Sequence, residues 1–439
     1  MSALVISGMT GNEIFCLAQK GLLPGELCVG NSVCSMGLGG AVGSFGQALA
    51  GGEIRQITEL ISEGRHAAIT RMEQEAQRFG AAGVTSVVTE LRTLAGYTEF
   101  LSQGTAVHAQ PDHVLALGAA RRDAPGGPAM PFFSTAASGM QTYCHLDAGY
   151  RPMKFVMGNI AYALGVGRGI SGGFRKFARG EVHEYSQMYN EIRHVALQRI
   201  REEASHAGAN AVVDIQIRML PYGPGAIELL MTGTASHHAN VSPGHVAPQQ
   251  VVTSELTGEE LWNLAKLGLV PVSLVMSTSV FSLGIAGGIG AWFKSFSKGE
   301  LPEVTSLVYH ARENCLDLLR KEAQALGAER VVGNKLIIQE LSPGLIEVVA
   351  IGTALRRATG FEPQAPALMP QAIIVDKDVL ESEGPLRQLP AQQPLMTGGG
   401  ARRQMSPVGC IVLAVWMMLV MIAIVGGIVA SLTGGHHHR

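Results

Sequence analysis

The sequence predicts an α+β protein made of three tandem copies of one unit and a single C-terminal transmembrane helix. A Glu-Ala pair followed by Gly-Ala recurs at Gly80, Gly208 and Gly327. A Gly-Glu pair stands 28 residues before each of these glycines. Recurrence at a fixed spacing is typical of chains built from similar structural units. Segment 408–432 contains no charged residue, which predicts the transmembrane helix.

Each unit begins with a glycine, has a Gly-x-x-Pro sequence ten residues later, and ends with Gly-Thr-Ala. In the third unit, "PVSLVMSTSVF" has strand character. Apolar residues then recur at intervals of three and four between 299 and 326, which predicts an amphipathic helix. Pro302 suits the first turn of this helix and Gly327 suits its end. Two further strand-like runs flank Ser342-Pro343-Gly344, which predicts a hairpin.

We therefore expect each unit to be an antiparallel sheet packed on one long helix. Such a unit leaves a sheet edge and a helix flank uncovered, and neighbouring units in a tandem array or a ring would cover them. The expected boundaries are 1–109 for unit one, 110–131 for a linker, 132–240 for unit two, 241–250 for a second linker, 251–359 for unit three, 360–407 for a Pro-, Gln- and Gly-rich linker, 408–432 for the transmembrane helix and 433–439 for a short tail.

The segment from Val408 to Leu432 is longer than the roughly 20 apolar residues that cross a bilayer. A buried helix of a globular domain is the alternative, but such a helix normally keeps a polar stripe. Arg402 and Arg403 precede the segment and only Arg439 follows it, which favours a cytoplasmic location for the repeats. The sequence therefore predicts a tail-anchored, single-pass membrane protein in which an extended linker joins the repeats to the transmembrane helix.

Composition excludes several other classes of protein. The formal net charge is -2 and no basic cluster is present, which argues against a nucleic-acid partner. The six cysteines are scattered along the chain and form no Cys-x-x-Cys pair. Such scattered cysteines are typical of reduced thiols in a cytosol-like compartment. The N-terminus has neither a basic region nor a long apolar core, so we expect no secretory signal.

The third unit carries "ARENCLDLLRKEAQALGAERVVG" followed by a hairpin that ends in Gly-Thr-Ala. These residues resemble the YbjQ family of small bacterial proteins, and the resemblance covers all three units. It implies a small α+β sandwich that assembles into pentameric rings, and heavy-metal binding is ascribed to the family. This chain departs from the family because it joins three units and adds a membrane segment, so the resemblance does not fix the number of units in a ring.

A soft-metal site would need Cys and His side chains that converge. Cys16 and Cys144 recur at the same position of units one and two, and His145 follows the second of them. These three residues are the candidate ligands for a heavy-metal ion. A buried thiol beside a recurring aromatic residue is the alternative interpretation.

Aromatic and basic residues end the Gly-rich stretch of units two and three, in "GGFRKFARGE" and "AWFKSFSKGE". A segment of this kind can touch anionic lipid, and a contact between units is the alternative. The candidate residues are Phe174, Arg175, Phe177, Trp292, Phe293 and Phe296.

Four charged positions recur in all three units. The arginine and the second glutamate lie ten residues apart on the predicted helix, about 15 Å along its axis, so they cannot pair with each other. Each can reach a neighbouring unit, and arginine suits bidentate pairs at interfaces. We expect these residues to set the register of unit on unit, with solvated helix charge as the alternative. They are Glu53, Glu181 and Glu300; Arg65, Arg193 and Arg312; Glu75, Glu203 and Glu322; and Glu99, Glu228 and Glu347.

No catalytic motif is found in the sequence. A Gly-x-Gly-x-x-Gly occurs at Gly167, Gly169 and Gly172, but it lacks the βαβ context of a dinucleotide loop. Nothing resembles a nucleophile elbow, a P-loop or a zinc helix. The sequence predicts a non-catalytic scaffold that assembles with copies of itself into a ring. A membrane-tethered heavy-metal-binding protein is the alternative function.

Overall fold

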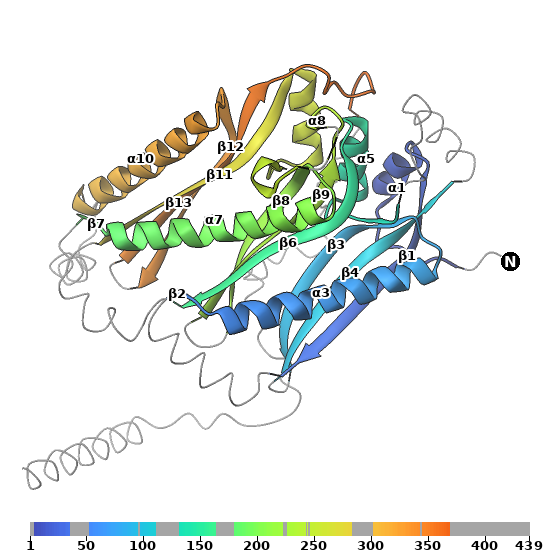
Figure 1. The fold of residues 1–439 in the computed structure, drawn as a ribbon, viewed down its shortest axis with the longest axis horizontal. Helices are drawn as coiled ribbons and strands as arrows, with labels where there is room; N and C mark the ends of the chain where they lie inside the picture. The colour runs from blue at the N-terminus through green and yellow to red at the C-terminus, as the bar shows by residue number, and fades with distance from the viewer. Residues whose placement is uncertain are drawn as a thin grey trace, which may run out of the picture. The chain divides into compact units, whose positions relative to one another are not determined.

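The computed structural model describes residues 4–35, 52–94, 97–110, 131–163, 180–222, 226–242, 244, 246–282, 302–342 and 345–368. Met1–Val375 form one compact unit (Figure 1). The predicted membrane span at 408–432 and the tail after it lie outside the described residues. Among the helices within the described ranges, none is long and apolar enough to cross a bilayer.

The described residues form three similar sets of helices and strands. Unit one contains α1 (Gly11–Ala18), β1 (Leu22–Cys34), β2 (Gly52–Glu53), α3 (Arg55–Arg78), β3 (Gly83–Leu94) and β4 (Tyr97–Ala109). Unit two contains β5 (Phe133–Ser134), α5 (Gly139–Asp147), β6 (Arg151–Ala163), β7 (Gly180–Glu181), α7 (His183–His206), β8 (Ala211–Pro221) and β9 (Ala226–His237). The linker before unit three contains η3 (Pro248–Gln250), and unit three contains β10 (Val252–Thr253), α8 (Gly258–Lys266), β11 (Leu269–Ser282), α10 (Pro302–Ala325), β12 (Arg330–Ser342) and β13 (Leu345–Arg357). The three sheet-rich units of mixed α+β structure confirm the predicted repeat.

Each unit has one sheet in which the last of its three long strands lies between the first and the second. The strand orders are β1-β4-β3-β5, β10-β8-β9-β6-β2 and β12-β13-β11-β7. The long strands pair in antiparallel fashion. One long helix, α3, α7 or α10, lies along each sheet (Figure 1).

Short strands cross from each unit into the sheet of its neighbour. β5 of unit two pairs in parallel with β3 of unit one, and β10 of unit three pairs in parallel with β8 of unit two. In the opposite direction, β2 pairs with β6 and β7 pairs with β11. Each junction between units is therefore a two-way exchange of strands, and it covers sheet edges that would otherwise expose unpaired backbone groups.

Local sequence explains how the helices begin and end. Each short helix opens with a capping box, in which the side chain at the N-cap and the side chain three residues later bond each other's backbone N–H groups. Each long helix is followed by a glycine of positive φ, Gly80, Gly208 or Gly327, which suits the left-handed turn after a helix.

The helix and the sheet approach most closely at one position of each unit. A Cβ atom on Gly30 would lie 2.1 Å from the carbonyl oxygen of Ala68, and a Cβ on Gly158 would lie 2.1 Å from that of Ala196. In unit three the matching residue is Ser277, whose hydroxyl donates to the carbonyl of Cys315 at 2.7 Å. The recurring small residue therefore allows the long helix to lie directly on the first strand.

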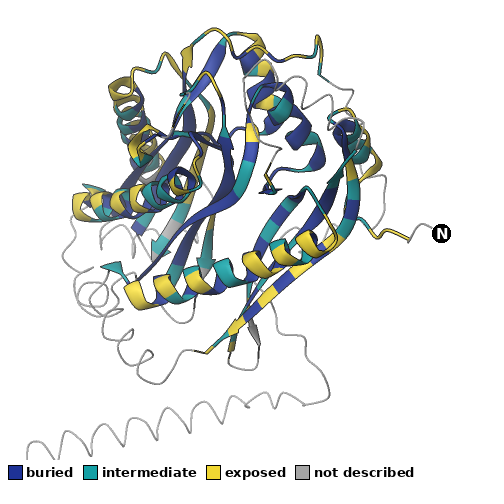
Figure 2. Ribbon diagram, turned by 45° about the vertical axis from the view of Figure 1, so that its right-hand side comes forward, coloured by how far each residue is buried: buried dark blue, intermediate teal, exposed yellow. Residues whose placement is uncertain are grey.

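The apolar core continues from unit to unit. One cluster joins Met72 and Val84 of unit one to Phe155 and Met157 of unit two. A larger cluster joins units two and three, with Leu274 among its members. Figure 2 shows long stretches of buried strand, whereas β1 alternates between buried and exposed residues. At both internal junctions, the contact between units is therefore made by buried apolar side chains, as in the core of a single domain.

Candidate assembly interface

A buried ion pair joins units one and two. Arg65 on α3 and Glu228 on β9 are both fully buried. Nη2 of Arg65 donates to Oε2 of Glu228 at 2.7 Å, and Nε donates to Oε1 at 3.2 Å. The remaining nitrogen, Nη1, donates to the hydroxyl of Thr89 at 3.2 Å. The pair is bidentate, which fixes both the distance and the orientation of the two units.

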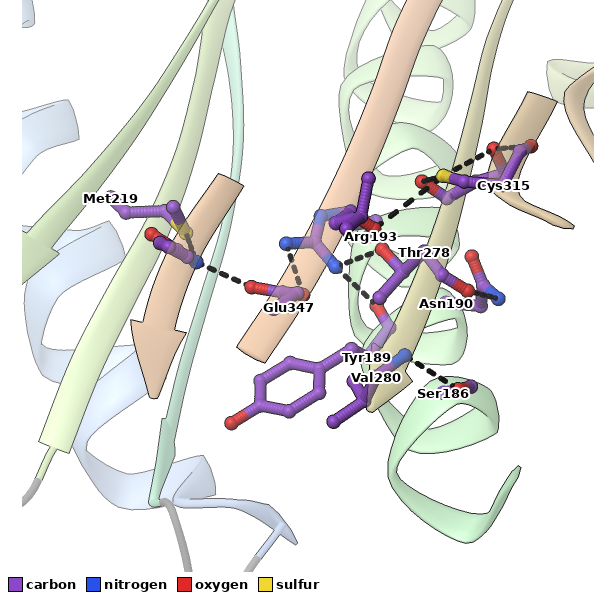
Figure 3. Close-up of polar contacts among 12 residues, drawn as sticks. Ser186, Tyr189, Asn190, Arg193, Met219, Thr278, Val280, Cys315 and Glu347 are labelled. Carbon is purple, nitrogen blue, oxygen red and sulfur yellow. Dashed lines mark hydrogen bonds and ion pairs between the residues drawn. The ribbon is translucent and has the colours of Figure 1, made fainter. Parts of the chain in front are cut away.

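The same pair recurs between units two and three (Figure 3). Nη2 of Arg193 on α7 lies 2.8 Å from Oε1 of Glu347 on β13. Nη1 donates to the hydroxyl of Thr278 at 2.5 Å, and the side-chain amide of Gln339 donates to the other oxygen of Glu347. Arg193 is 3 % exposed and Glu347 is fully buried. The contact therefore runs each time from the long helix of one unit to the last strand of the next.

The third copy of this pair is split between the two ends of the repeat array. Arg312 occupies the same position on α10 as Arg65 and Arg193 on their helices, yet it is exposed. Glu99 occupies the position of Glu228 and Glu347, yet it is half-buried. Among the described residues, neither has a partner. Unit three thus carries an unmatched arginine and unit one an unmatched glutamate.

The second recurring glutamate also faces the preceding unit. Oε2 of Glu203 accepts the backbone N–H of Met157 at 2.9 Å, and Oε1 lies 3.0 Å from Nε2 of His66 in unit one. This hydrogen bond raises the pKa of His66. Through its backbone contact, Glu203 joins α7 to β6 of its own unit. Through the histidine contact, it joins α7 to α3 of unit one.

The glutamate–histidine contact recurs at Glu322 in unit three and is absent at Glu75 in unit one. Glu322 accepts the N–H of Met276 at 3.1 Å and lies 3.1 Å from Nε2 of His194, whose pKa it raises. Glu75 accepts the N–H of Val29 at 2.6 Å, but no histidine of the described chain reaches it. Glu75 is therefore another group in unit one whose contact with a preceding unit is absent.

The short helices make a third contact that repeats. The backbone N–H of Gly139, which begins α5, donates to Oε1 of Glu13 on α1 at 3.1 Å. A Cβ on Gly139 would lie 2.7 Å from the Cβ of Glu13, and a Cβ on Gly258 would lie 2.6 Å from the carbonyl oxygen of Gln141. The matching glycine of unit one is Gly11, and a Cβ there would meet nothing within 4 Å. Among the described short helices, only α1 has no preceding short helix packed against its first glycine.

A groove of about 330 Å³ lies between α10 and β12, and Leu319, Ala323, Ala328 and Val331 line it. In unit one the matching residues, such as Met72 and Val84, pack against apolar residues of unit two. In unit three the matching cluster contains residues of unit three alone. The groove is thus the position at which each earlier unit receives its neighbour.

The first recurring glutamate differs between its copies. Glu53 lies 2.8 Å from Nη2 of Arg199 in unit two, which is a contact between units. Glu181 accepts hydrogen bonds from Ser186 of its own unit and from Ser279 of unit three. Glu300 lies outside the described residues, as do the predicted lipid or inter-unit contacts Phe174, Arg175, Phe177, Trp292, Phe293 and Phe296.

The candidate metal ligands lie in an apolar environment. Cys16 and Cys144 belong to one buried cluster that also holds Tyr143 and Trp262. Burial raises the pKa of Cys16 and raises that of Cys144 to about 12. Burial lowers the pKa of His145 to about 4, and neither of its ring nitrogens has a hydrogen-bond partner among the described residues. Within the described ranges, no group of three or more His, Cys, Asp or Glu side chains is placed to hold a metal ion. Metal binding by these three residues stays a prediction.

Sequence reasoning missed a hydroxyl that also recurs at the junctions. The hydroxyl of Thr58 accepts the N–H of Ala161 in unit two at 2.9 Å, and that of Ser186 accepts the N–H of Val280 in unit three at 2.9 Å. Both hydroxyls stand seven residues before the recurring arginine. That shared position was the available signal. It was missed because Ser and Thr in a helix commonly bond their own backbone.

The chain matches a known family over most of its length. Three segments, 25–110, 149–239 and 267–358, match the YbjQ_1 family, whose description reads "Putative heavy-metal-binding". The chain belongs to this family. YbjQ relatives of a single unit's length include a UPF0145 protein of Methanoregula boonei, 40% identical over 85 residues, which are 19% of this chain and 71% of the relative. Another, from Thermotoga maritima, is 37% identical over 90 residues, 20% of this chain and 85% of the relative.

A longer relative spans more of the repeat array. It is the Encapsulin nanocompartment protein Rv1762c of Mycobacterium tuberculosis, 27% identical over 227 residues. The match covers 51% of this chain and 85% of the relative. The relatives of this chain thus include proteins matched over one unit and a protein matched over a longer stretch of the array.

Proposed function

We propose that this protein is a non-catalytic scaffold, which assembles through its repeat units with further copies of itself into a closed ring. The observation that supports the proposal is the buried arginine–glutamate pair, which is complete at both internal junctions and divided between Arg312 and Glu99 at the two ends. Two ends that carry opposite halves of one contact form a heterologous interface, and such an interface closes into a ring when its rotation allows.

The residues that recur serve contacts between units rather than a reaction. The buried arginines, their glutamate partners, Gly139 and Gly258 each contact a neighbouring unit. The named function of the mycobacterial relative, an encapsulin nanocompartment protein, also concerns an assembled structure. We infer that this chain likewise acts by building an assembly, and that it is not an enzyme.

We further propose that the uncharged segment 408–432 anchors the assembly in a membrane, with the repeats in the cytoplasm. The length of the segment and the two arginines before it support this part of the proposal. The Pro- and Gln-rich linker would then separate the ring from the lipid surface.

The test is the mass of the full chain in detergent micelles, measured by native mass spectrometry, with negative-stain images of the same sample. We expect one discrete multimer with a closed outline. Because each chain brings three units, the number of units in the ring is a multiple of three. A chain that stays monomeric at micromolar concentration would contradict the scaffold, and flotation with liposomes tests the anchor separately.

A further inference from the structure

We propose that unit three of one copy binds unit one of a second copy, and that this junction between chains reproduces the two internal junctions residue by residue. The proposal rests on the scaffold function and specifies its interface. It pairs Arg312 on α10 of one copy with Glu99 on β4 of the next, as Arg65 pairs with Glu228 and Arg193 with Glu347.

Strand register shows which residues of unit one are equivalent to buried residues of the later units. Leu27 pairs across the sheet with Thr105, as Phe155 does with Thr234 and Leu274 with Thr353. Phe155 and Leu274 are 1% and 0% exposed because the preceding unit covers them, whereas Leu27 is 44% exposed. Unit one therefore lacks the cover that units two and three receive at this position.

The exposure of β1 continues along the strand at alternate positions. Val29 is 43% exposed and Val33 is 55% exposed. Their equivalents in the later units, such as Met157 and Ala161, are buried. Within the described ranges, this face of β1 thus carries exposed apolar residues that no other unit covers, although the matching faces of β6 and β11 lie inside the core.

The groove between α10 and β12 occupies the position at which the equivalent stripe of the next unit is received in the earlier units. In unit one, the residues equivalent to its lining pack against Phe155 and Met157 of unit two. The equivalents of Phe155 and Met157 in the first unit are Leu27 and Val29. We therefore place Leu27 and Val29 of the second copy in the groove of about 330 Å³. Five of the lining residues, Leu316, Leu319, Ala323, Ala328 and Val331, are apolar, so this contact would remove the exposed side chains of Leu27 and Val29 from water.

The N-terminal residues supply the exchanged strand. Ser134 of β5 and Thr253 of β10 bond the N–H groups of Phe155 and Leu274 through their hydroxyls. At the same position of unit one, the carbonyl of Ile6 accepts the N–H of Leu27 at 3.0 Å. Val5 and Ile6 are therefore the equivalents of β5 and β10, and they remain exposed, at 43% and 72%.

In the junction between chains, Val5 and Ile6 pair in parallel with Arg330 and Val331 on β12. These two residues are the equivalents of Gly83 and Val84, which pair with β5. The added strand pairs with the edge of β12 at these two residues, because β12 is the outermost strand of its sheet. Gly11 likewise receives the side chain of Glu260 on α8, as Gly139 receives Glu13.

Charge at one further position makes the junction selective. Nη2 of Arg201 in unit two donates to the hydroxyl of Ser273 in unit three at 2.6 Å. At the proposed junction between chains, Arg320 on α10 of one copy is the equivalent of Arg201, and Glu26 on β1 of the second copy is the equivalent of Ser273. The neutral acceptor of the internal junction is thus replaced by an acidic one. Arg320 and Glu26 carry opposite charges, which favours this pairing and steers the two ends together.

One position opposes the contact. Glu313 stands where units one and two carry His66 and His194, so it faces Glu75 of the second copy in place of a histidine–glutamate pair. Like charges at this distance repel. We expect the junction between chains to be weaker than the internal junctions, which makes the assembly reversible while each chain stays intact.

The test uses full-length protein in detergent and measures assembly by sedimentation. Arg312→Glu and Glu99→Arg should each weaken assembly at least about a hundredfold, since a charge pair at the interface becomes a like-charge contact. The double variant, with both changes in one chain, should assemble again, because every junction between its copies joins opposite charges at these two positions, whatever the number of chains in the ring. Glu59→Arg, an exposed position of α3, is the matched control and should assemble as the unsubstituted protein does.

The outcomes separate the two proposals. If the unsubstituted protein assembles and both variants assemble equally well, the junction is wrong and the scaffold stands. Loss of assembly in each single variant without recovery in the double variant also overturns the pairing of Arg312 with Glu99. A monomeric unsubstituted protein overturns the scaffold and the junction together. Circular dichroism of each variant establishes that it is folded, as the exposure of Arg312 leads us to expect.

Discussion

Replacement of Arg65 by methionine should destabilise the repeat array far more than the same change at Arg312. Arg65 is fully buried, and its removal leaves the carboxylate of Glu228, also fully buried, without its bidentate partner. Breaking a buried pair in this way typically costs about 3 to 5 kcal/mol. Arg312 is exposed in the single chain, so Arg312→Met should change the free energy of unfolding by about 0.5 kcal/mol or less.

The double variant Arg65→Met with Glu228→Leu provides the decisive comparison. Replacing both charges by apolar groups of similar volume removes the unpaired carboxylate, so most of the lost stability should return. The partner hydroxyl of Thr89 then keeps only weak contacts, and we expect a residual loss of about 1 kcal/mol.

The assay is urea unfolding of residues 1–375, which form a compact unit of their own, followed by far-ultraviolet circular dichroism. Protein should be kept dilute enough to be monomeric, so that assembly does not add to the apparent stability. The reasoning fails if Arg65→Met and Arg312→Met cost the same, or if the double variant is no more stable than the single one.

Three further predictions concern other parts of the array. Gly139→Ala should lower the free energy of unfolding by about 1 to 3 kcal/mol, because its Cβ would lie 2.7 Å from that of Glu13, whereas Gly11→Ala should leave the monomer unchanged and weaken assembly. Sedimentation beside urea unfolding checks both parts. Glu313→His should tighten assembly several-fold by restoring the histidine–glutamate pair of the internal junctions, and an unchanged dissociation constant would contradict the facing position of Glu75. Burial raises the pKa of Asp214 to about 7, so the folded state favours the protonated acid and loses stability as pH rises from about 4 through 7. Asp214→Asn should therefore add up to about 4 kcal/mol at pH 8 and nothing at pH 4, and an equal effect at both pH values would refute this cause.

The sequence was sufficient to predict the repeat, the long helix and the long strands before and after it, because these follow from local patterns, but it did not predict the short helices α1, α5 and α8. The apolar spacing between 299 and 326 predicted the helix now observed at Pro302–Ala325, and the two strand-like runs predicted to form a hairpin are the antiparallel pair β12 and β13. The short strands β5 and β10 could not be predicted in the same way. Two residues are too few to show a strand period, and both strands exist only because a neighbouring sheet offers an edge.

The sequence was sufficient to predict which residues belong to the candidate interface, but not which of these residues contact each other. Helix geometry shows that Arg193 cannot reach Glu203 along its own helix. It does not show that the partner is Glu347, 154 residues later, since that contact depends on how two units pack. The same limit applies to Cys16 and Cys144. Their shared position in the repeat indicates a shared environment, and only the fold shows that this environment is a buried apolar cluster.

The way that strands cross at each junction has a consequence for how such chains can vary in length. Unit two gives β5 to unit one and accepts β10 from unit three, and each internal junction uses a buried arginine and a glutamate from the same positions. A gene that gains or loses one whole unit therefore joins two surfaces that already fit. Duplication and deletion of units can change the size of the array without the evolution of a new contact surface, and the two ends keep the same faces whatever the number of units between them.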